Sequence, residues 1–139
     1  MDKEALRSII LEILQEEAGT CPVKKVSLAA ITCTEQDRLD TGDAAHRVYT
    51  HDLFSFKESP RLGVGIMEME ESTFPWTLAY DEVDYVLSGA LTICWGEKRI
   101  TAQPGEVLLL PKGSEIRFSA REKTRFLYVT YPADWKNQA

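Results

Sequence analysis

The sequence predicts an all-β protein, a double-stranded β-helix (jelly-roll) barrel preceded by an amphipathic N-terminal helix. From residue 47 onward, short runs rich in β-branched and aromatic residues follow one another without any helical period. Turn residues separate these runs, most clearly Gly89, Gly96, Gly105 and Gly113. Residues 3–18 instead repeat their apolar positions every three or four residues, which is typical of a helix with one apolar face.

The size and charge of the chain limit its class. Its 139 residues suit one domain with one core, and its net charge of −6 repels nucleic acid, so we expect no nucleic-acid partner. No apolar run approaches the roughly 20 residues of a membrane span and no secretory signal is visible, so we expect a soluble, cytoplasmic protein without a membrane partner. The three cysteines form no CxxC pair, which argues against a disulfide framework and a zinc site.

Residues 1–19 form the predicted helix. Leu6, Ile9, Ile10, Ile13 and Leu14 share one face, Asp2 is placed to cap the start, and Gly19 marks the end. A helix of this length is marginal alone in water, so its apolar face needs a surface to cover it. Residues 20–45 form a linker or barrel-wrapping arm, in which 23–31 is weakly strand-like.

Residues 46–139 form the predicted barrel. Closing a sheet on itself removes exposed edges, which explains why so many short strands would assemble in this way. The expected strands cover residues 47–56, 62–70, 74–79, 83–87, 90–95, 99–102, 107–110, 115–119 and 125–131.

Two spaced motifs within the barrel resemble the signatures of the cupin superfamily. Glu82 is followed after six residues by Gly89, and Gly105 is followed by the Pro111-Lys112-Gly113 turn. The short stretch between the motifs leaves room for one hairpin, turning at residues 96–97. Tight corners of this kind favour glycine, because a side chain restricts the backbone there.

The residues expected to bind metal in cupins are missing. Metal-binding cupins carry two histidines before the glutamate and a third after the second signature. Here the first pair falls on Trp76 and Leu78 or on Pro75 and Thr77, and the third falls on Ile116. We therefore expect no transition metal. The two histidines of the chain, His46 and His51, lie upstream, and hydrogen-bonded or exposed roles suit them better than metal ligation.

Three longer motifs closely resemble the EutQ family of ethanolamine-utilisation proteins. These are WTL-x-YDE-x-DYV at residues 76–86, PKGS-x-I-x-FS at 111–119 and RFLYV-x-YPADW at 125–135. The resemblance is strongest from residue 59 to 135. It implies a cupin barrel without the metal triad and a role in ethanolamine breakdown inside or beside a bacterial microcompartment. It also implies an acetate kinase activity, which would use ATP and Mg²⁺.

The candidate site centres on Glu82 and Asp84, which alternation along a strand places on one face. Two neighbouring carboxyl groups do not both ionise easily, so one would keep a proton and act as an acid or base, and we assign both as catalytic candidates. In the alternative, they make structural hydrogen bonds or pair with Arg125. The expected ligand-binding residues, which would offer an apolar wall with polar groups at one mouth, are Glu68, Trp76, Tyr80, Tyr128 and Arg125.

Two functions of different classes remain open from the sequence. The first is an acetate kinase, although the chain lacks the phosphate-binding string GxxxxGK[ST]. The cations between residues 112 and 125 could contact phosphates, or they form a solvated charged surface. The second is a non-catalytic small-molecule-binding or microcompartment assembly module. In either case we expect a homodimer, with the N-terminal helix as a possible contact to microcompartment shell proteins.

Overall fold

The computed structural model describes residues 2–17 and 23–138. The chain divides into two units, Met1–Ile31 and Thr32–Ala139, and each is considered by itself. The arm from Thr32 onward therefore belongs to the same unit as the barrel. Within the described residues, no helix combines the length and the apolar character that a membrane crossing requires.

The N-terminal unit contains the helix α1 (Lys3–Glu17). The Asp2 carboxylate accepts a hydrogen bond of 2.7 Å from the Ala5 amide, which satisfies one of the free N–H groups at the helix start. This confirms the predicted helix and its cap. The side chain of Leu14, the predicted stop at Gly19, and Cys21 lie outside the described residues.

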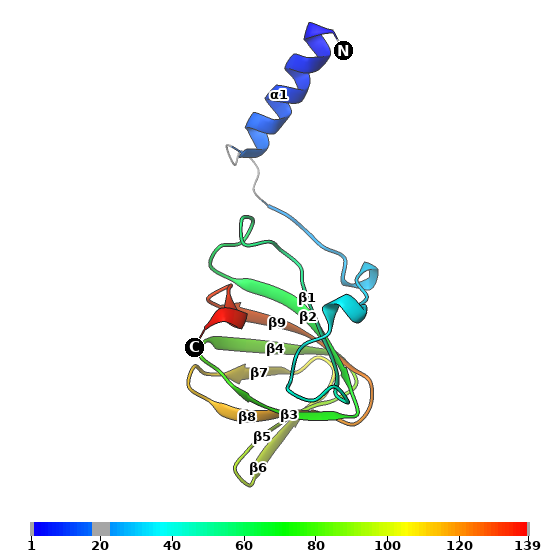
Figure 1. Cartoon of the computed structure of the whole chain (residues 1–139), viewed down its shortest axis with the longest axis vertical. Helices are drawn as coiled ribbons and strands as arrows, with labels where there is room; N and C mark the ends of the chain where they lie inside the picture. Colours follow the sequence, from blue (N-terminus) through cyan, green and yellow to red (C-terminus); the bar gives the residue numbers. More distant parts are fainter. Residues whose placement is uncertain (1, 18–22, 139) are drawn as a thin grey trace. The chain divides into compact units, whose positions relative to one another are not determined.

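The barrel unit consists of two antiparallel sheets that face each other (Figure 1). One sheet has the order β1-β2-β9-β4-β7 and the other has the order β3-β8-β5-β6. The non-sequential neighbours confirm the predicted jelly-roll type of topology. The strands are β1 (Arg47–Asp52), β2 (Gly63–Glu70), β3 (Ser72–Thr77), β4 (Asp81–Ser88), β5 (Leu91–Trp95), β6 (Lys98–Ala102), β7 (Val107–Leu110), β8 (Glu115–Ala120) and β9 (Thr124–Tyr131).

A row of aromatic rings joins the two sheets in the core. Phe74 from β3 stacks on Phe118 from β8 at 5.4 Å between ring centroids, and Phe118 stacks on Phe126 from β9 at 6.2 Å. All three side chains are fully buried or nearly so. Because side chains alternate between the faces of a strand, these inward residues are separated by outward ones, and each sheet presents one apolar face to the other.

The predicted turns lie where the glycines suggested. Gly89 has a φ of +77°, and a Cβ there would come within 2.5 Å of the Lys123 carbonyl oxygen, so this corner requires glycine. Gly105 also adopts a positive φ. The hairpin between β5 and β6 turns at residues 96–97, with Trp95 paired to Lys98.

The arm differs from the sequence prediction. Residues 23–31 contain no strand; a 3₁₀ turn, η1 (Leu28–Ala30), lies there instead. A second 3₁₀ turn, η2 (Glu35–Asp37), is followed by Leu39, whose amide donates a 2.9 Å hydrogen bond to the Val48 carbonyl of β1. The apolar residues of 23–31 do not alternate with polar ones along the segment, so the pattern of a half-buried strand is missing and a local turn forms instead.

Both histidines take part in hydrogen bonds beside the arm. His46 Nδ1 lies 2.7 Å from the Thr41 hydroxyl, and His51 Nδ1 lies 3.0 Å from the Asp37 carboxylate.

Candidate functional site

Glu82 and Asp84 point into the barrel from β4. Their exposed fractions are 5% and 0%, whereas Val83 and Tyr85 between and after them are 37% and 40% exposed. The strand lies between β9 and β7, so its inward side chains are covered from both sides. The alternation predicted from the sequence is therefore confirmed, and it places two acids in an apolar core.

The two carboxyl groups have few partners. Among the described residues, no hydrogen-bond donor reaches Oε2 of Glu82 or either carboxyl oxygen of Asp84. Burial raises the pKa of Glu82 to about 6, and hydrogen bonds with Asp84 and Tyr80 partly offset this rise. Burial, and then the charge of Glu82, raise the pKa of Asp84 well above its usual range. A proton held between the two groups relieves both effects, so the pair can donate or accept a proton near neutral pH.

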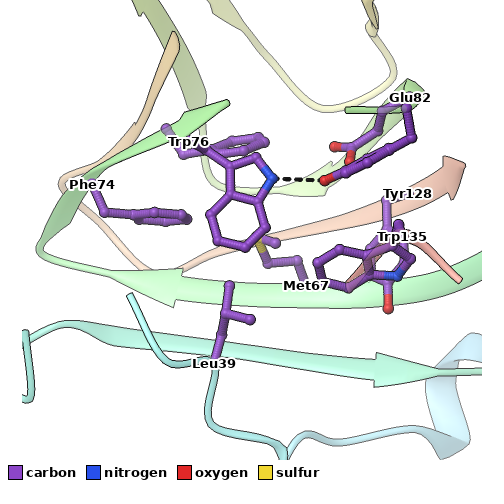
Figure 2. A pocket seen from close by; sticks show the side chains of 9 residues that line it. Leu39, Met67, Phe74, Trp76, Glu82, Tyr128 and Trp135 are labelled. Atoms are coloured by element: carbon purple, nitrogen blue, oxygen red, sulfur yellow. Dashed lines mark hydrogen bonds between the residues drawn. The ribbon is translucent and has the colours of Figure 1, made fainter. Parts of the chain in front are cut away.

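A small cavity lined mainly by aromatic side chains lies beside Glu82 (Figure 2). The cavity has a volume of about 10 Å³, which is close to the minimum for one water molecule. The Trp76 indole N–H donates a hydrogen bond of 2.7 Å to the Tyr80 hydroxyl, drawn as the dashed line in Figure 2. The lining residues are Leu39, Met67, Phe74, Trp76, Tyr80, Glu82, Phe118, Tyr128 and Trp135.

Trp135, from the C-terminal turn η3 (Trp135–Asn137), packs over this cavity. Its ring centroid lies 6.0 Å from that of Trp76, 5.9 Å from that of Tyr80 and 5.7 Å from that of Tyr128. The sequence did not reveal Trp135 as part of the site, although this residue ends the RFLYV-x-YPADW motif. Leu39 of the arm also lines the cavity. Two segments outside the strands therefore complete the enclosure.

Tyr128 has a second role that the sequence did not reveal. Its hydroxyl donates a 2.7 Å hydrogen bond to the Asp52 carboxylate at the end of β1. The ring reaches that position because its partner across β2 is Gly65, where a Cβ would overlap the Tyr128 hydroxyl. A glycine at a close crossing of this kind has a packing role.

Glu68 and Arg125 do not share this cavity. The two residues are opposite each other on β2 and β9, on the outer face of the sheet, whereas the neighbouring Met67 and Phe126 point inward. The expectation that Glu68 and Arg125 line one mouth with Trp76 is therefore wrong, because their strand positions have the opposite parity. The alternative pairing of Arg125 with Glu82 or Asp84 is excluded for the same reason.

Glu68 instead lies beneath the arm. Its Oε2 accepts hydrogen bonds of 3.4 Å from the Cys33 amide and from Arg125 Nη1. Burial, followed by the charge of Glu68, raises the pKa of the Cys33 thiol to about 12. This cluster fastens the arm to the barrel, and a pocket of about 250 Å³ beside it is lined by Arg47, Glu70 and Lys123, among others.

The cations between residues 112 and 125 do not converge on one point. Arg117 projects from the outer face of β8, whereas Arg125 projects from the outer face of the other sheet. Lys112 lies in the turn between β7 and β8, where its amide donates a hydrogen bond to Asp81. Adjacency in sequence therefore does not gather all of these cations on one sheet.

The described residues also contain no group of three or more His, Cys, Asp or Glu side chains arranged to hold a metal ion. The barrel positions where a metal triad would stand are occupied by apolar residues, including the buried Ile116. A transition-metal centre beside Glu82 therefore does not fit the donor set of this cavity.

Comparison with known proteins places the chain in a family. The family model described as "Ethanolamine utilisation protein EutQ" matches residues 1–137. "Acetate kinase EutQ" of Clostridioides difficile strain 630 is 44% identical, with 99% of this chain and 96% of that protein covered. The protein of the same name from Salmonella typhimurium is 38% identical over 69% of this chain and 42% of its own length.

Solved structures agree with this assignment. The structure of the Clostridium difficile EutQ protein has a TM-score of 0.83 and 51% identity, covering 85% of this chain and 86% of that one. A cupin-2 domain protein from Shewanella frigidimarina has a TM-score of 0.53 and 26% identity, covering 60% of this chain and 78% of that one. The chain therefore belongs to the EutQ family of ethanolamine utilisation proteins and has the cupin fold.

Proposed function

We propose that this chain transfers a phosphoryl group from ATP to acetate, with the Glu82–Asp84 pair as the acetate-binding group. Two curated relatives are named acetate kinases, and one of them matches nearly the whole chain. The observation that carries the proposal is a pair of buried carboxyl groups with unpartnered oxygens, of which Glu82 lines an enclosed cavity. Unpartnered buried polar atoms are costly, so a pair of this kind is expected to serve a function.

The reaction itself defines what the pair would do. An acetate oxygen attacks the γ-phosphorus of ATP, the bond between that phosphorus and the β,γ-bridging oxygen breaks, and ADP leaves with the bond electrons. Acetate is already ionised at neutral pH, so no general base is needed. A protonated carboxyl group of Glu82 or Asp84 would donate a hydrogen bond to the second acetate oxygen and orient the nucleophile. Mg²⁺ would arrive with the phosphates of ATP.

Entry of acetate requires the cavity to enlarge. Its present volume of about 10 Å³ does not hold four heavy atoms. Trp135 and Leu39 close it from segments outside the strands, and these residues would move most easily. The proposal therefore includes an opening of the C-terminal turn before substrate binds.

Acetyl phosphate formation by the purified full chain tests the proposal. Glu82→Gln is expected to lower turnover about 100-fold, because the amide does not orient acetate as the carboxyl group does, while the melting temperature barely changes. Glu97→Gln, at an exposed position in the β5–β6 turn, is the matched control and is expected to leave turnover unaffected. If wild-type protein freed of contaminating kinases forms no acetyl phosphate, the kinase proposal is rejected.

A non-catalytic binding or assembly module is the second candidate, favoured by the closed cavity and by the absence of a phosphate-binding loop. Under this alternative Glu82 is a structural group. Glu82→Gln would then cost about 1–3 kcal/mol of unfolding free energy, while turnover per folded molecule would not change. Measuring both quantities on the same preparations distinguishes the two candidates.

We also propose that the chain forms a homodimer through the outer face of β4 and β7. Tyr85, Val107 and Leu109 are 40%, 61% and 69% exposed there, and β7 is an edge strand of its sheet. Exposed apolar patches on an open edge favour association. Leu109→Glu should convert a dimer into a monomer in light scattering, whereas Leu62→Glu, at an exposed position outside this face, should not.

The apolar face of α1 supports a further proposal, attachment to microcompartment shell proteins. Leu6, Ile9, Ile10 and Ile13 follow a helical spacing typical of helices that bind in grooves. Residues 1–19 fused to a fluorescent reporter should co-purify with shells, and Ile9→Glu in the same fusion should abolish this. Equal retention of both fusions would reject the proposal.

A further inference from the structure

The outer face of the four-stranded sheet carries a row of hydroxyl side chains. Ser119 of β8 is in register with Thr73 of β3 on one side and Thr92 of β5 on the other, and Thr92 is in register with Thr101 of β6. The Thr73 and Ser119 hydroxyls are 2.7 Å apart, and so are those of Thr92 and Thr101. The row crosses all four strands of the sheet, so it forms a continuous polar surface.

Three arginines lie beside this row of hydroxyl groups. Arg99 of β6 and Arg117 of β8 are both in register with Cys94 of β5, so they flank it from either side on the same face. Arg121 follows Ser119 at the end of β8. Within the described part of the chain, no carboxylate lies within 4 Å of the guanidinium groups of these three arginines.

A hollow covers the same residues. It has a volume of about 600 Å³ and is lined by Arg99, Arg121 and Glu122, together with the hydroxyl residues of β5, β6 and β8 and with Cys94. A second hollow, of about 310 Å³, contains Arg117 and also reaches Cys94. The two hollows therefore meet at Cys94. Together they contain three arginines and two acids, Glu122 in the larger hollow and Glu115 in the smaller. In a chain with a net charge of −6, this is a local excess of positive charge.

We propose that this face binds a polyphosphate group of two or three phosphoryl units, of the kind found in nucleoside di- and triphosphates. Guanidinium groups form paired, charge-assisted hydrogen bonds with phosphate oxygens, and hydroxyl groups add neutral ones. The Cα atoms of Arg99 and Arg117 are two strand spacings apart, about 10 Å, and Arg121 lies one residue beyond the end of β8. A chain of two or three phosphoryl units is long enough to extend across this face and contact several of these guanidinium groups together.

The site is distinct from the Glu82–Asp84 cavity. Its residues alternate along the strands with the inward-pointing Ile93 and Phe118, so their side chains lie on the opposite face of the sheet. The sheet therefore separates this site from the barrel interior. The inference does not rest on the proposed kinase activity, because binding can be measured with pyrophosphate alone and without acetate.

Calorimetric titration of the full chain with pyrophosphate at low ionic strength tests the site. Arg99→Gln is expected to weaken binding about 10-fold or more, the usual effect of losing a charge-assisted hydrogen bond. Lys98→Gln is the matched control, because it removes the same charge one residue away, at a position of the opposite parity that does not line the hollow. That control should change the affinity about twofold or less. Melting temperatures of both variants should equal that of the wild type, because both side chains are exposed.

A second readout is independent of net charge. Pyrophosphate should slow the alkylation of Cys94, measured by peptide mass spectrometry, with the concentration dependence found by calorimetry. ATP binding at least as tightly as pyrophosphate, with adenosine not binding, would support a nucleotide polyphosphate as the ligand. Sulfate binding as tightly as pyrophosphate would mean an adventitious ion only and would overturn the proposal. Equal weakening by Arg99→Gln and Lys98→Gln, or unprotected Cys94, would overturn it as well.

Discussion

Glu82 and Asp84 hold two carboxyl groups on the same inward face of β4, and burial raises the pKa of both. Water reaches neither group freely, and Oε2 of Glu82 and both carboxyl oxygens of Asp84 lack donors among the described residues. The state of lowest free energy is therefore one in which the pair retains a proton. This gives the protein a stability that depends on pH in a direction opposite to that of most carboxylates.

The first prediction concerns this pH dependence. The folded chain binds more protons at this pair than the unfolded chain, so the free energy of unfolding falls as the pH rises from about 4 through the raised pKa values. The rise of the Glu82 pKa from 4.5 to about 6 alone corresponds to about 2 kcal/mol. Asp84→Asn removes one ionisable group whose pKa is raised by burial, so it should increase the free energy of unfolding at pH 8 and flatten the pH profile.

Urea denaturation between pH 4 and pH 9 measures this effect. Glu97→Gln, which removes an exposed carboxylate, should reproduce the wild-type profile. If Asp84→Asn is less stable than wild type at pH 8, burial does not destabilise the ionised form of this carboxyl pair as described.

The second prediction concerns Trp135 as the closure of the cavity. This side chain is 5% exposed and contacts the rings of Trp76, Tyr80 and Tyr128. Trp135→Ala should cost about 3–5 kcal/mol of unfolding free energy, because it removes a large buried side chain. Trp95→Ala, at a position that is 41% exposed, is the matched substitution and should cost much less. Equal losses in thermal denaturation would show that the C-terminal turn does not pack as described.

The third prediction concerns the contact of Gly65 with Tyr128. A Cβ at residue 65 would overlap the Tyr128 hydroxyl, so Gly65→Ala should displace the ring and break its hydrogen bond to Asp52, at a cost of about 1–3 kcal/mol. Tyr128→Phe removes the same hydrogen bond without the overlap. The double variant should lose less stability than the sum of the two single variants, because both act on one interaction. Additive losses in urea denaturation would exclude this coupling.

The fourth prediction compares two cysteines. Because burial and Glu68 raise the pKa of Cys33 to about 12, its thiolate is scarce near neutral pH. Iodoacetamide at pH 8 should therefore modify Cys33 on the order of 100-fold more slowly than Cys94. Glu68→Gln should increase the Cys33 rate and leave the Cys94 rate unchanged, as followed by peptide mass spectrometry. Equal rates at both thiols would contradict the partial burial of Cys33 between the arm and the barrel.

The sequence by itself determined the strands, the turns and the shared direction of the Glu82 and Asp84 side chains. Alternation along residues 81–88 was sufficient to place Glu82 and Asp84 on one face, because the period of a strand is a local property. The helix start at Asp2 and the glycine corners are local in the same sense. The family motifs pointed to the cupin fold, which the comparisons with solved structures support.

The tertiary structure alone decided which residues meet. Glu68 and Arg125 have suitable chemistry for the cavity, but the pairing of β2 with β9 puts them on the outer face. Trp135 and Leu39 reach the cavity from segments without a periodic pattern, so the spacing of residues did not place them there. Arg99, Arg117 and Arg121 come together only because β6, β5 and β8 are neighbours in one sheet. Contacts between distant segments depend on strand order and register, which the spacing of residues within a single strand does not encode.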